Sequence, residues 1–362
     1  MHNSTDYNFK NISSLKPIFI IGHPKSGTSL LNALLDSHPQ LLVLPEETDY
    51  YSIIWPVARL LNLSWRISSD QKANTLLNLI TTKSHLRNLY RGKVEKDISG
   101  NINYTNFPSS EFSKHLNEYF KNNLFFKRST TLVNIFTCFF KASGTVFSND
   151  LKYWVEKTPS NTWYVNRILR DFPESVFLFV YRDPRDNYIS YKKKWEDHQN
   201  PIKFSKTWNE TFEKASLIPE ERIYEIKYEK LVRSTDEVIN GLRDFLGLQE
   251  TDSLLTPTKL GKLWYGNSMF DIQRKIVDNN SVGRYKSSIN EYDRDVIERL
   301  CATTMEKRGY ELSTVQSSLD RPALSEILYE YRRQPSKITS NFRLKLIGRS
   351  LKTLVTGRCS EC

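Results

Sequence analysis

The chain has 362 residues and carries a formal net charge of +11 at pH 7. This length suits one large α/β domain with insertions and does not require a second domain. The positive charge favours an anionic partner, such as nucleic acid, an anionic membrane, an acidic substrate or a phosphorylated cofactor, although a Lys- and Asn-rich composition alone also produces it. Because no run approaches the ~20 apolar residues of a membrane span, we predict no transmembrane segment.

The N-terminal residues and the cysteines indicate a cytoplasmic protein without a metal site. Residues 1–16 are polar, lack the apolar core of a secretory signal, and are predicted to be flexible. Cys138 and Cys301 have apolar neighbours and are predicted to be buried thiols in a reducing compartment. Cys359 and Cys362 form a C-x-x-C pair, but no second pair of ligands has the spacing of a zinc site.

The first predicted elements are a strand, a loop, a helix and a second strand. Residues 17–21 are apolar and end at Gly22, which predicts a buried parallel strand that leads into a loop. Leucines at helical spacing then predict a helix that begins at Thr28 and stops at Pro39. Residues 41–44 predict a second short strand, so this part of the chain has the order of a βαβ unit.

Residues from about 52 to 150 predict a helical insertion that could shape an acceptor site. Aromatic side chains in and just after this region could stack on a sugar or an aromatic ring, although most such residues belong to a core. They include Trp55, Trp65, Tyr90, Tyr104, Trp154 and Trp163.

Beyond the insertion, helices and strands alternate along the chain. A helix is predicted at 163–170, and a strongly apolar strand at 175–181 is followed by another helix. Residues 223–227 predict a fourth strand, and the helix at 235–246 ends at Gly247, a typical C-terminal cap. This alternation predicts an α/β fold with a central parallel sheet and helices on both faces, a three-layer sandwich of the P-loop type.

The loop after the first strand has the glycine spacing of a phosphate-binding loop but a displaced lysine. Gly22 and Gly27 are spaced as in G-x-x-x-x-G-K-[ST], whereas position 28 is Thr and the lysine lies inside the loop at Lys25. A glycine-rich loop before a helix offers backbone N–H groups and the positive end of the helix dipole to an anion, and Thr28 and Ser29 add hydroxyls. Such a loop suits an anion site that needs neither a γ-phosphate nor Mg²⁺.

A second anion site is predicted at the end of the strand 175–181. Arg182 follows this strand directly and can form a bidentate pair with a phosphate, and Ser190 on the next helix can add a hydroxyl donor. The alternative is a surface salt bridge between Arg182 and Asp183. Because ligands of open α/β sheets bind at the carboxyl ends of strands, the two sites together suit a nucleotide with a phosphate on its ribose and a second anionic group at its 5′ end.

Five segments in this order resemble motifs of the sulfotransferases that use 3′-phosphoadenosine 5′-phosphosulfate (PAPS). They are PKSGTSLL at 24–31, VYRDPRDNYISY at 180–191, IKYEKLV at 226–232, SVGRYK at 281–286 and MEKRGYEL at 305–312. The resemblance runs from about residue 17 to residue 312, and the motifs are nearest to the tyrosylprotein and Golgi carbohydrate branches. The tyrosylprotein branch is secretory and disulfide-bonded near these sites, and because no cysteine lies near them here, the chain resembles a bacterial-type member.

The resemblance implies the residues that bind the donor. The 5′-phosphosulfate would be held by Lys25, Ser26, Gly27, Thr28 and Ser29, the 3′-phosphate by Arg182 and Ser190, and the adenosine by Tyr228, while Ser281, Arg284 and Lys286 would belong to a loop that closes over the nucleotide. It further implies PAPS as the donor, 3′-phosphoadenosine 5′-phosphate (PAP) as the product, and no metal.

The resemblance also implies a catalytic base. Sulfuryl transfer to a hydroxyl needs a group that removes the hydroxyl proton. Glu46 and Glu47 lie in an E-E-T segment that matches the tyrosylprotein pattern, in which the second glutamate, Glu47, would be the base. Glu46, expected to be a structural partner of a basic loop, and the histidines His85 and His115 of the insertion remain alternatives.

Lys157 is the predicted electrophilic partner of this base. It lies in VEKTPSN, which resembles a family segment whose lysine points at the sulfuryl group or the bridging oxygen. An ammonium group there, together with Lys25, would stabilise the negative charge that develops on the leaving oxygen. The alternative for Lys157 is a solvated surface lysine.

The residues after 312 are predicted to form a basic extension, 313–362, that is partly helical. Within 331–362, apolar residues recur at helical spacing between basic residues, which predicts a basic amphipathic helix. The apolar positions are Leu344, Ile347, Leu351 and Leu354. This helix could lie on the inner face of an anionic membrane or pack against the domain, and packing is the simpler interpretation.

The sequence therefore predicts a PAPS-dependent sulfotransferase that acts on a hydroxyl of a glycan, a lipid head group, a small alcohol or phenol, or a tyrosine. A P-loop kinase or ATPase is the first alternative, but it would need Lys at position 28 and a Walker B aspartate, for which Asp183 is the candidate. The second alternative is a basic protein that binds a membrane or nucleic acid, although we expect no nucleic acid partner.

Overall fold

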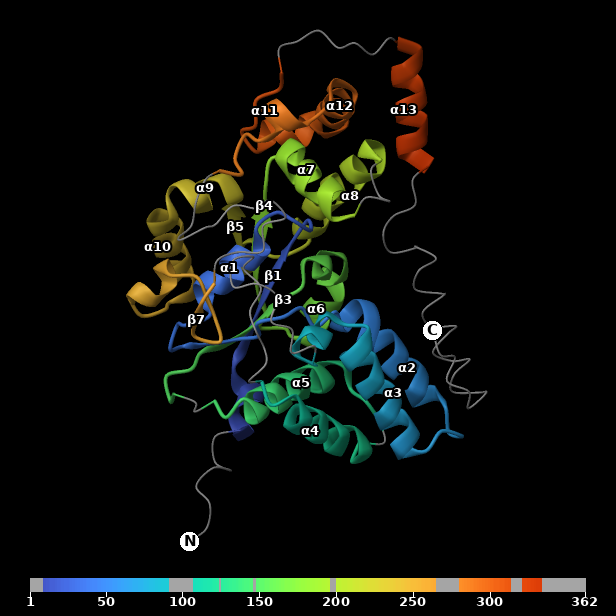
Figure 1. The fold of residues 1–362 in the computed structure, drawn as a ribbon, viewed down its shortest axis with the longest axis vertical. Helices are drawn as coiled ribbons and strands as arrows, with labels where there is room; N and C mark the ends of the chain where they lie inside the picture. Colours follow the sequence, from blue (N-terminus) through green and yellow to red (C-terminus); the bar gives the residue numbers. More distant parts are fainter. Residues whose placement is uncertain are drawn as a thin grey trace.

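A parallel sheet lies at the centre of the computed structural model (Figure 1), which describes residues 9–90, 107–123, 125–145, 148–195, 200–264, 280–313 and 321–333. Within these residues the sheet has five strands in the order β2-β3-β1-β4-β5, and every neighbouring pair is parallel. The strands are β1 (Lys16–Gly22), β2 (Leu41–Val43), β3 (Tyr153–Lys157), β4 (Val176–Tyr181) and β5 (Ile223–Lys227). The four strands predicted from the sequence are confirmed.

Strand β3 is the one that the sequence prediction missed. It lies between β2 and β1, with Ile18 of β1 paired to Val155 of β3 on one side and to Val176 of β4 on the other. The run Tyr-Trp-Val at the start of β3 is apolar, but the whole strand is only five residues long and directly follows a long helical region. Because β1, β3 and β4 are parallel neighbours, the residues that follow Gly22, Lys157 and Tyr181 meet at one edge of the sheet.

Both faces of the sheet are buried, as the predicted three-layer α/β fold requires. On one face, Ile20, Leu178 and Ile226 pack against the helices α1 (Thr28–Leu35), α9 (Tyr228–Arg233) and α10 (Thr235–Leu246). On the opposite face, aromatic side chains such as Phe19 and Phe179 pack into a larger core that includes residues of α6 (Val165–Asp171) and α8 (Pro201–Ala215). Successive strand residues point to opposite faces, which explains why these strands are almost continuously apolar.

The helical insertion is present and shares the larger core with the sheet. Its described elements are the π-helical turn η2 (Tyr50–Ile54), the helices α2 (Trp55–Leu63), α3 (Ser69–Thr82), α4 (Ser109–Lys121) and α5 (Arg128–Ala142), and the 3-10 turn η3 (His85–Tyr90). A capping box between Ser68 and Gln71 starts α3. Of the aromatic residues singled out in the sequence, Trp55, Trp154 and Trp163 are buried, Trp65 is exposed, and Tyr104 lies outside the described residues.

The remaining described elements are short turns, helices and a small hairpin. They are η4 (Pro159–Tyr164), α7 (Pro184–Lys194), η6 (Glu220–Arg222), η7 (Asp252–Leu255), α11 (Tyr285–Ser288), α12 (Glu291–Lys307) and the hairpin of β6 (Thr258–Lys259) and β7 (Lys262–Leu263).

The predicted buried thiols are confirmed for Cys138 and Cys301, and burial raises the pKa of each to about 12. No helix among the described residues is both long and apolar enough to cross a bilayer.

The two ends of the chain differ in part from their predicted character. Residues 1–8 lie outside the description, but the 3-10 turn η1 (Phe9–Ser14) places Ile12 in the larger core, so the segment 1–16 is not a free tail throughout. In the C-terminal extension, α13 (Arg321–Arg333) is described, and Tyr331 accepts hydrogen bonds from Lys206 and Asn209 of α8. The predicted basic amphipathic helix, with its apolar positions between residues 344 and 354, lies outside the described residues, as does the pair Cys359 and Cys362.

Candidate active site

The loop between β1 and α1 has a backbone that two glycines make possible. At Gly22, a Cβ atom would lie 2.2 Å from the carbonyl oxygen of Val180 in β4, so the loop starts in close contact with that strand. Gly27, with φ 106°, is the N-terminal cap of α1, and a Cβ there would lie 2.3 Å from the ring of Tyr228. Lys25 also has a positive φ, 71°, which a lysine rarely adopts and which is characteristic of functional sites.

Strand β4 and helix α7 hold this loop in place. The guanidinium of Arg182, directly after β4, donates to the carbonyl oxygen of Lys25 at 3.4 Å, and Asn187 of α7 donates to that of Pro24 at 3.0 Å. The hydroxyl of Ser26 is buried and has no hydrogen-bond partner among the described residues. A buried donor without a partner is rare in folded proteins and indicates a place that a ligand atom fills.

Arg182 is the centre of the second predicted anion site. Its Nη1 donates to the hydroxyl of Ser190 at 3.3 Å, and its Nη2 donates to the carbonyl oxygen of Ser281 at 2.5 Å. Its guanidinium lies 4.5 Å from the ring centroid of Tyr228, whose hydroxyl in turn contacts that of Ser281 at 2.7 Å. The buried Nε of Arg182 has no partner among the described residues. The structure thus brings Arg182, Ser190, Tyr228 and Ser281 together.

The segment after Ser281 is held by a carboxylate that the sequence reasoning did not identify. Asp186 of α7 accepts hydrogen bonds from the backbone N–H groups of Gly283 at 2.6 Å and Tyr285 at 2.8 Å. Arg284 donates to the carbonyl oxygen of Asn280 at 3.3 Å. Lys286 is exposed on the following turn, so the structure does not bring it to the buried group around Arg182.

Glu47 and Lys157 form an ion pair next to the loop. Lys157, the last residue of β3, is buried, and its Nζ lies 2.6 Å from Oε1 of Glu47 in the segment after β2. Burial alone would raise the pKa of Glu47, but the charges of Lys157 and His85 outweigh it and lower that pKa. For Lys157, burial works to lower the pKa, and the charge of Glu47 raises it above its ordinary value. Lys157 is therefore not a solvated surface residue.

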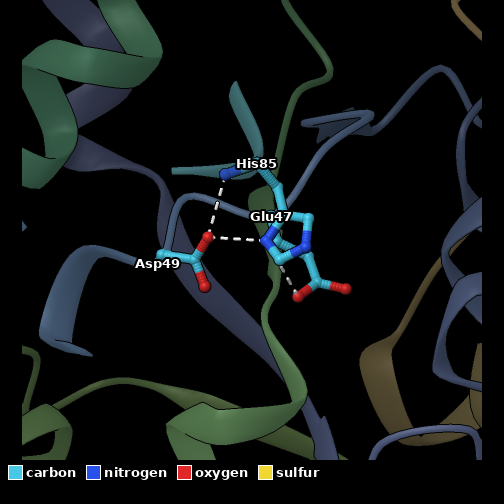
Figure 2. A group of neighbouring side chains, drawn as sticks. All are labelled: Glu47, Asp49 and His85. Atoms are coloured by element: carbon cyan, nitrogen blue, oxygen red, sulfur yellow. Dashed lines mark hydrogen bonds and ion pairs between the residues drawn. The ribbon is translucent and has the colours of Figure 1, made fainter. Parts of the chain in front are cut away.

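His85 faces Glu47 from the helical insertion, and Asp49 holds it there (Figure 2). The carboxylate of Asp49 accepts from both the backbone N–H and Nδ1 of His85, at 2.9 and 2.6 Å, and Nδ1 lies 3.7 Å from Glu47. Burial opposes the charged imidazole, but the hydrogen bond to Asp49 and the charge of Glu47 raise the pKa of His85 to about 9. At neutral pH the ring is therefore a cation that faces two carboxylates.

The ligand atoms of Glu47, Asp49 and His85 lie within 4.8 Å of one another, so among the described residues these are the side chains that could share a metal ion. However, Asp49 already pairs with His85, and Glu47 with Lys157. The two carboxylates of the cluster are thus paired with two cations, His85 and Lys157.

Glu156 fixes the segment that carries Glu47 to strand β3. This fully buried carboxylate accepts from the backbone N–H and hydroxyl of Thr48, at 3.3 and 2.7 Å, from the hydroxyl of Thr158 and from the amide of Asn161, both at 2.5 Å. Burial raises the pKa of Glu156 to about 7. Because Thr48 follows Glu47 and Glu156 precedes Lys157, these bonds set the position of the ion pair.

The other two candidates for the base are placed differently. Glu46 accepts hydrogen bonds from Lys259 of the β6–β7 hairpin and from Asn88, each at 3.0 Å, which fits a structural partner of a basic segment. His115 lies on α4 and faces Glu118 at 3.8 Å. Glu46 contributes to the raised pKa of Lys157 by its charge, but the direct ion-pair partner of Lys157 is Glu47.

The pKa of Lys25 is lowered by its surroundings. Burial and the positive charge of Lys194 lower the pKa of Lys25 to about 8, with smaller lowering contributions from Lys157 and Arg182, whereas Glu47 opposes the shift. Its ammonium is thus held among cations in a partly buried place. An arrangement of this kind is stabilised by a bound anion.

The site that the structure shows is a set of positive groups, and of buried donors without partners among the described residues, where neighbouring strands of an α/β sheet end beside the partly buried carboxylate of Glu47. This arrangement is typical of α/β proteins with a glycine-rich loop between the first strand and a helix, at the carboxyl end of a parallel sheet. The chain belongs to the sulfotransferase family, whose sequence model matches residues 17–252.

Solved structures support the same fold. The sulfotransferase domain of the Synechococcus PCC 7002 olefin synthase is 18% identical in sequence, with a TM-score of 0.54, covering 83% of this chain and 96% of that domain. The sulfotransferase domain from the curacin biosynthetic pathway is 17% identical, with a TM-score of 0.52, covering 83% of this chain and 99% of that domain. No curated protein sequence matches the chain.

The kinase alternative is not favoured by these findings. Asp183, the Walker B candidate, caps α7 and forms an ion pair with Arg185 at 2.7 Å. Arg185 also pairs with Glu298 of α12 at 2.6 Å, so Asp183 belongs to a buried structural network. It is thus not a free carboxylate facing the loop.

Proposed function

We propose that the chain transfers the sulfuryl group of PAPS to an acceptor hydroxyl and releases PAP. One observation carries this proposal. Arg182 links the loop at Lys25 to the group of Ser190 and Ser281, so that the two predicted anion sites adjoin. The Lys157–Glu47 pair lies at the end of β3, the strand beside β1, which leads into this loop. A donor with anionic groups at both ends of its nucleoside, and with its reactive group beside the Lys157–Glu47 pair, matches this arrangement.

The residues present suit such a donor. The hydroxyl of Ser26 and the Nε of Arg182 are buried donors without partners among the described residues, one in each anion site. We assign the 5′-phosphosulfate to Lys25, Ser26, Gly27, Thr28 and Ser29, the 3′-phosphate to Arg182 and Ser190, and the adenosine to Tyr228, with Ser281, Arg284 and Lys286 in the segment that closes the site. Of this segment, Ser281 already contacts Arg182 and Tyr228.

Glu47 is proposed as the base and Lys157 as the electrophilic partner. PAPS supplies a sulfur atom bonded to a good leaving group. Glu47 removes the acceptor proton while the acceptor oxygen forms its bond to sulfur, and the bond between sulfur and the 5′-phosphate oxygen breaks, its electron pair remaining on that oxygen. Lys157 and Lys25 stabilise the charge that builds there, because both ammonium groups lie largely out of bulk water and Lys157 is held in place by Glu47.

Thermal unfolding with PAP, compared with ATP and Mg²⁺, tests the donor site. A ligand that binds only the folded chain stabilises it by about 2.7 kcal/mol at a hundred times its dissociation constant. We expect a clear rise in Tm with PAP and little change with ATP and Mg²⁺. Lys25→Ala and Arg182→Ala should each reduce the PAP shift. A larger shift with ATP and Mg²⁺, or an unchanged PAP shift in both variants, would contradict the proposal.

A further inference from the structure

The outer tip of the helical insertion exposes three large apolar side chains. Trp65, Leu63 and Phe125 are 85%, 73% and 71% exposed, more than any other large hydrophobic residue in the described part of the chain. Single exposed apolar residues are normal on protein surfaces, but a group of them marks an interaction site. Their gathering on one feature therefore requires an explanation.

Two hydrogen bonds join the turns that carry these residues. The amide of Asn62 donates to the carbonyl oxygen of Phe126 at 2.8 Å, and the N–H of Phe126 donates to the side-chain oxygen of Asn62 at 2.9 Å. Leu63 and Trp65 follow in the α2–α3 turn, and Phe125 precedes in the α4–α5 turn. Phe126 itself is buried, so the chain turns inward there and leaves Phe125 outside.

The tip lies far from the sheet, and basic side chains lie beside its aromatic rings, Arg66 at Trp65 and Lys72 at Phe125. Figure 1 shows the α2–α3 turn at the outer edge of the molecule, away from the strand ends that form the active site. The guanidinium of Arg66 lies 4.9 Å from the ring centroid of Trp65, and Arg59 and Lys127 are exposed nearby in sequence. The acidic residue Asp70, at the start of α3, pairs with Lys121 at 2.8 Å.

We propose that this tip, formed by residues 63–66 and 125–127, docks on an anionic lipid surface. Aromatic and aliphatic side chains that protrude from a convex turn enter the interfacial region of a bilayer, where Trp is especially favoured. Arginine and lysine beside them stay at the level of anionic headgroups. This charge complementarity, together with three separate protruding side chains, fits a lipid surface. The inference does not depend on the proposed reaction.

Vesicle binding of the full chain tests this proposal. Phosphatidylcholine vesicles with about a third phosphatidylglycerol are compared with pure phosphatidylcholine vesicles by co-sedimentation. We expect the wild-type chain to bind only the anionic vesicles. The double variant Trp65→Ser, Phe125→Ser should bind them at least about ten-fold more weakly, because its apolar contacts are lost. The matched control is Leu217→Ser, Leu263→Ser, which changes two exposed leucines elsewhere and should bind as the wild type does.

The C-terminal extension is present in every variant, so its own attraction to anionic lipid cancels in the comparison. In addition, the emission of Trp65 should shift to shorter wavelength on anionic vesicles, and Trp65→Phe should bind but lack this part of the shift. Failure of the wild type to bind, or equal binding of the tip variant and the control, would overturn the proposal and leave a protein partner as the occupant of this surface.

Discussion

At the residue scale, the catalytic proposal depends on the placement of one carboxylate against two cations. Glu47 lies 2.6 Å from Lys157 and 3.7 Å from His85. These charges keep Glu47 ionised, as a base must be before it accepts a proton. The proposed base, Glu47, is thus in direct contact with the proposed electrophilic partner, Lys157.

Replacing Glu47 by Gln should remove turnover and leave donor binding intact. The amide cannot accept the acceptor proton, so we expect turnover to fall by about 10²- to 10⁴-fold. The PAP-induced rise in Tm should remain, because the proposed donor contacts are made by other residues. Transfer of labelled sulfate and thermal unfolding measure the two effects, and near-normal turnover of the variant would move the base to another residue.

The ion pair of His85 should make stability depend on pH. Its pKa is raised from 6.5 to about 9 in the folded chain, so its contribution is fully present below about pH 6.5 and is lost as the pH rises through about 9. We expect the stability gap between the wild type and His85→Gln to close across this range. Urea unfolding of both proteins from neutral to alkaline pH measures it, and a gap that is constant with pH would show that the imidazolium is not held by Asp49 and Glu47.

At the scale of the element, the loop between β1 and α1 functions through its backbone. Gly22 permits the contact with β4, and Gly27 leaves room for the ring of Tyr228. The displaced lysine is explained by the same geometry. Lys25 lies inside the loop with a left-handed backbone, among the charges of Arg182, Lys157 and Glu47, whereas position 28 starts the helix with a buried threonine.

Replacing Gly27 by Ala should therefore damage the site more than a comparable change elsewhere. The new Cβ would lie 2.3 Å from the Tyr228 ring, at φ 106°, so the ring or the loop must move. We expect PAP binding to weaken by about ten-fold or more, and the free energy of unfolding to fall by about 1–3 kcal/mol. The control is Gly144→Ala, which also has a positive φ, 66°, but open space around it. Equal effects of the two changes on PAP binding would contradict this account.

At the scale of the whole molecule, the insertion and the sheet form one body. Trp154 of β3 packs its ring 5.5 Å from Phe19 of β1 and 4.7 Å from Phe136 of α5, measured between centroids. The strand that carries Lys157 thus joins the sheet, where the donor is proposed to bind, to the helical insertion, whose turn η3 carries His85. The position of His85 relative to Lys157 therefore depends on a shared core.

Loss of this contact should lower the free energy of unfolding of the whole chain. Trp154→Ala removes a fully buried ring and should cost about 3–5 kcal/mol in the free energy of unfolding. Trp65→Ala, at an exposed position, should change it by less than about 0.5 kcal/mol. Urea unfolding compares the two variants, and a cost below about 1 kcal/mol for Trp154→Ala would show that the insertion and the sheet are stabilised separately.

Much of the fold and part of the site could be predicted from the sequence. Strands β1, β2, β4 and β5 have apolar runs with clear ends, and the glycine loop and the Arg182–Ser190 pair have local spacings that indicate an anion site. Strand β3 was missed because five residues after a long helical region give little periodicity. Its aromatic start, Tyr-Trp-Val, was the available signal.

The sequence by itself determined the alternation of strands and helices, the α/β class, and the motifs by which the sulfotransferase family is identified, because each of these depends on residues close together in the chain. Only the tertiary structure decided which groups meet. Glu47, His85 and Lys157 come from three separate segments, and Asp49, Glu156 and Asp186 gained their roles as partners through hydrogen bonds across the fold. Contacts of this kind depend on strand order and packing, and local sequence patterns do not encode them individually.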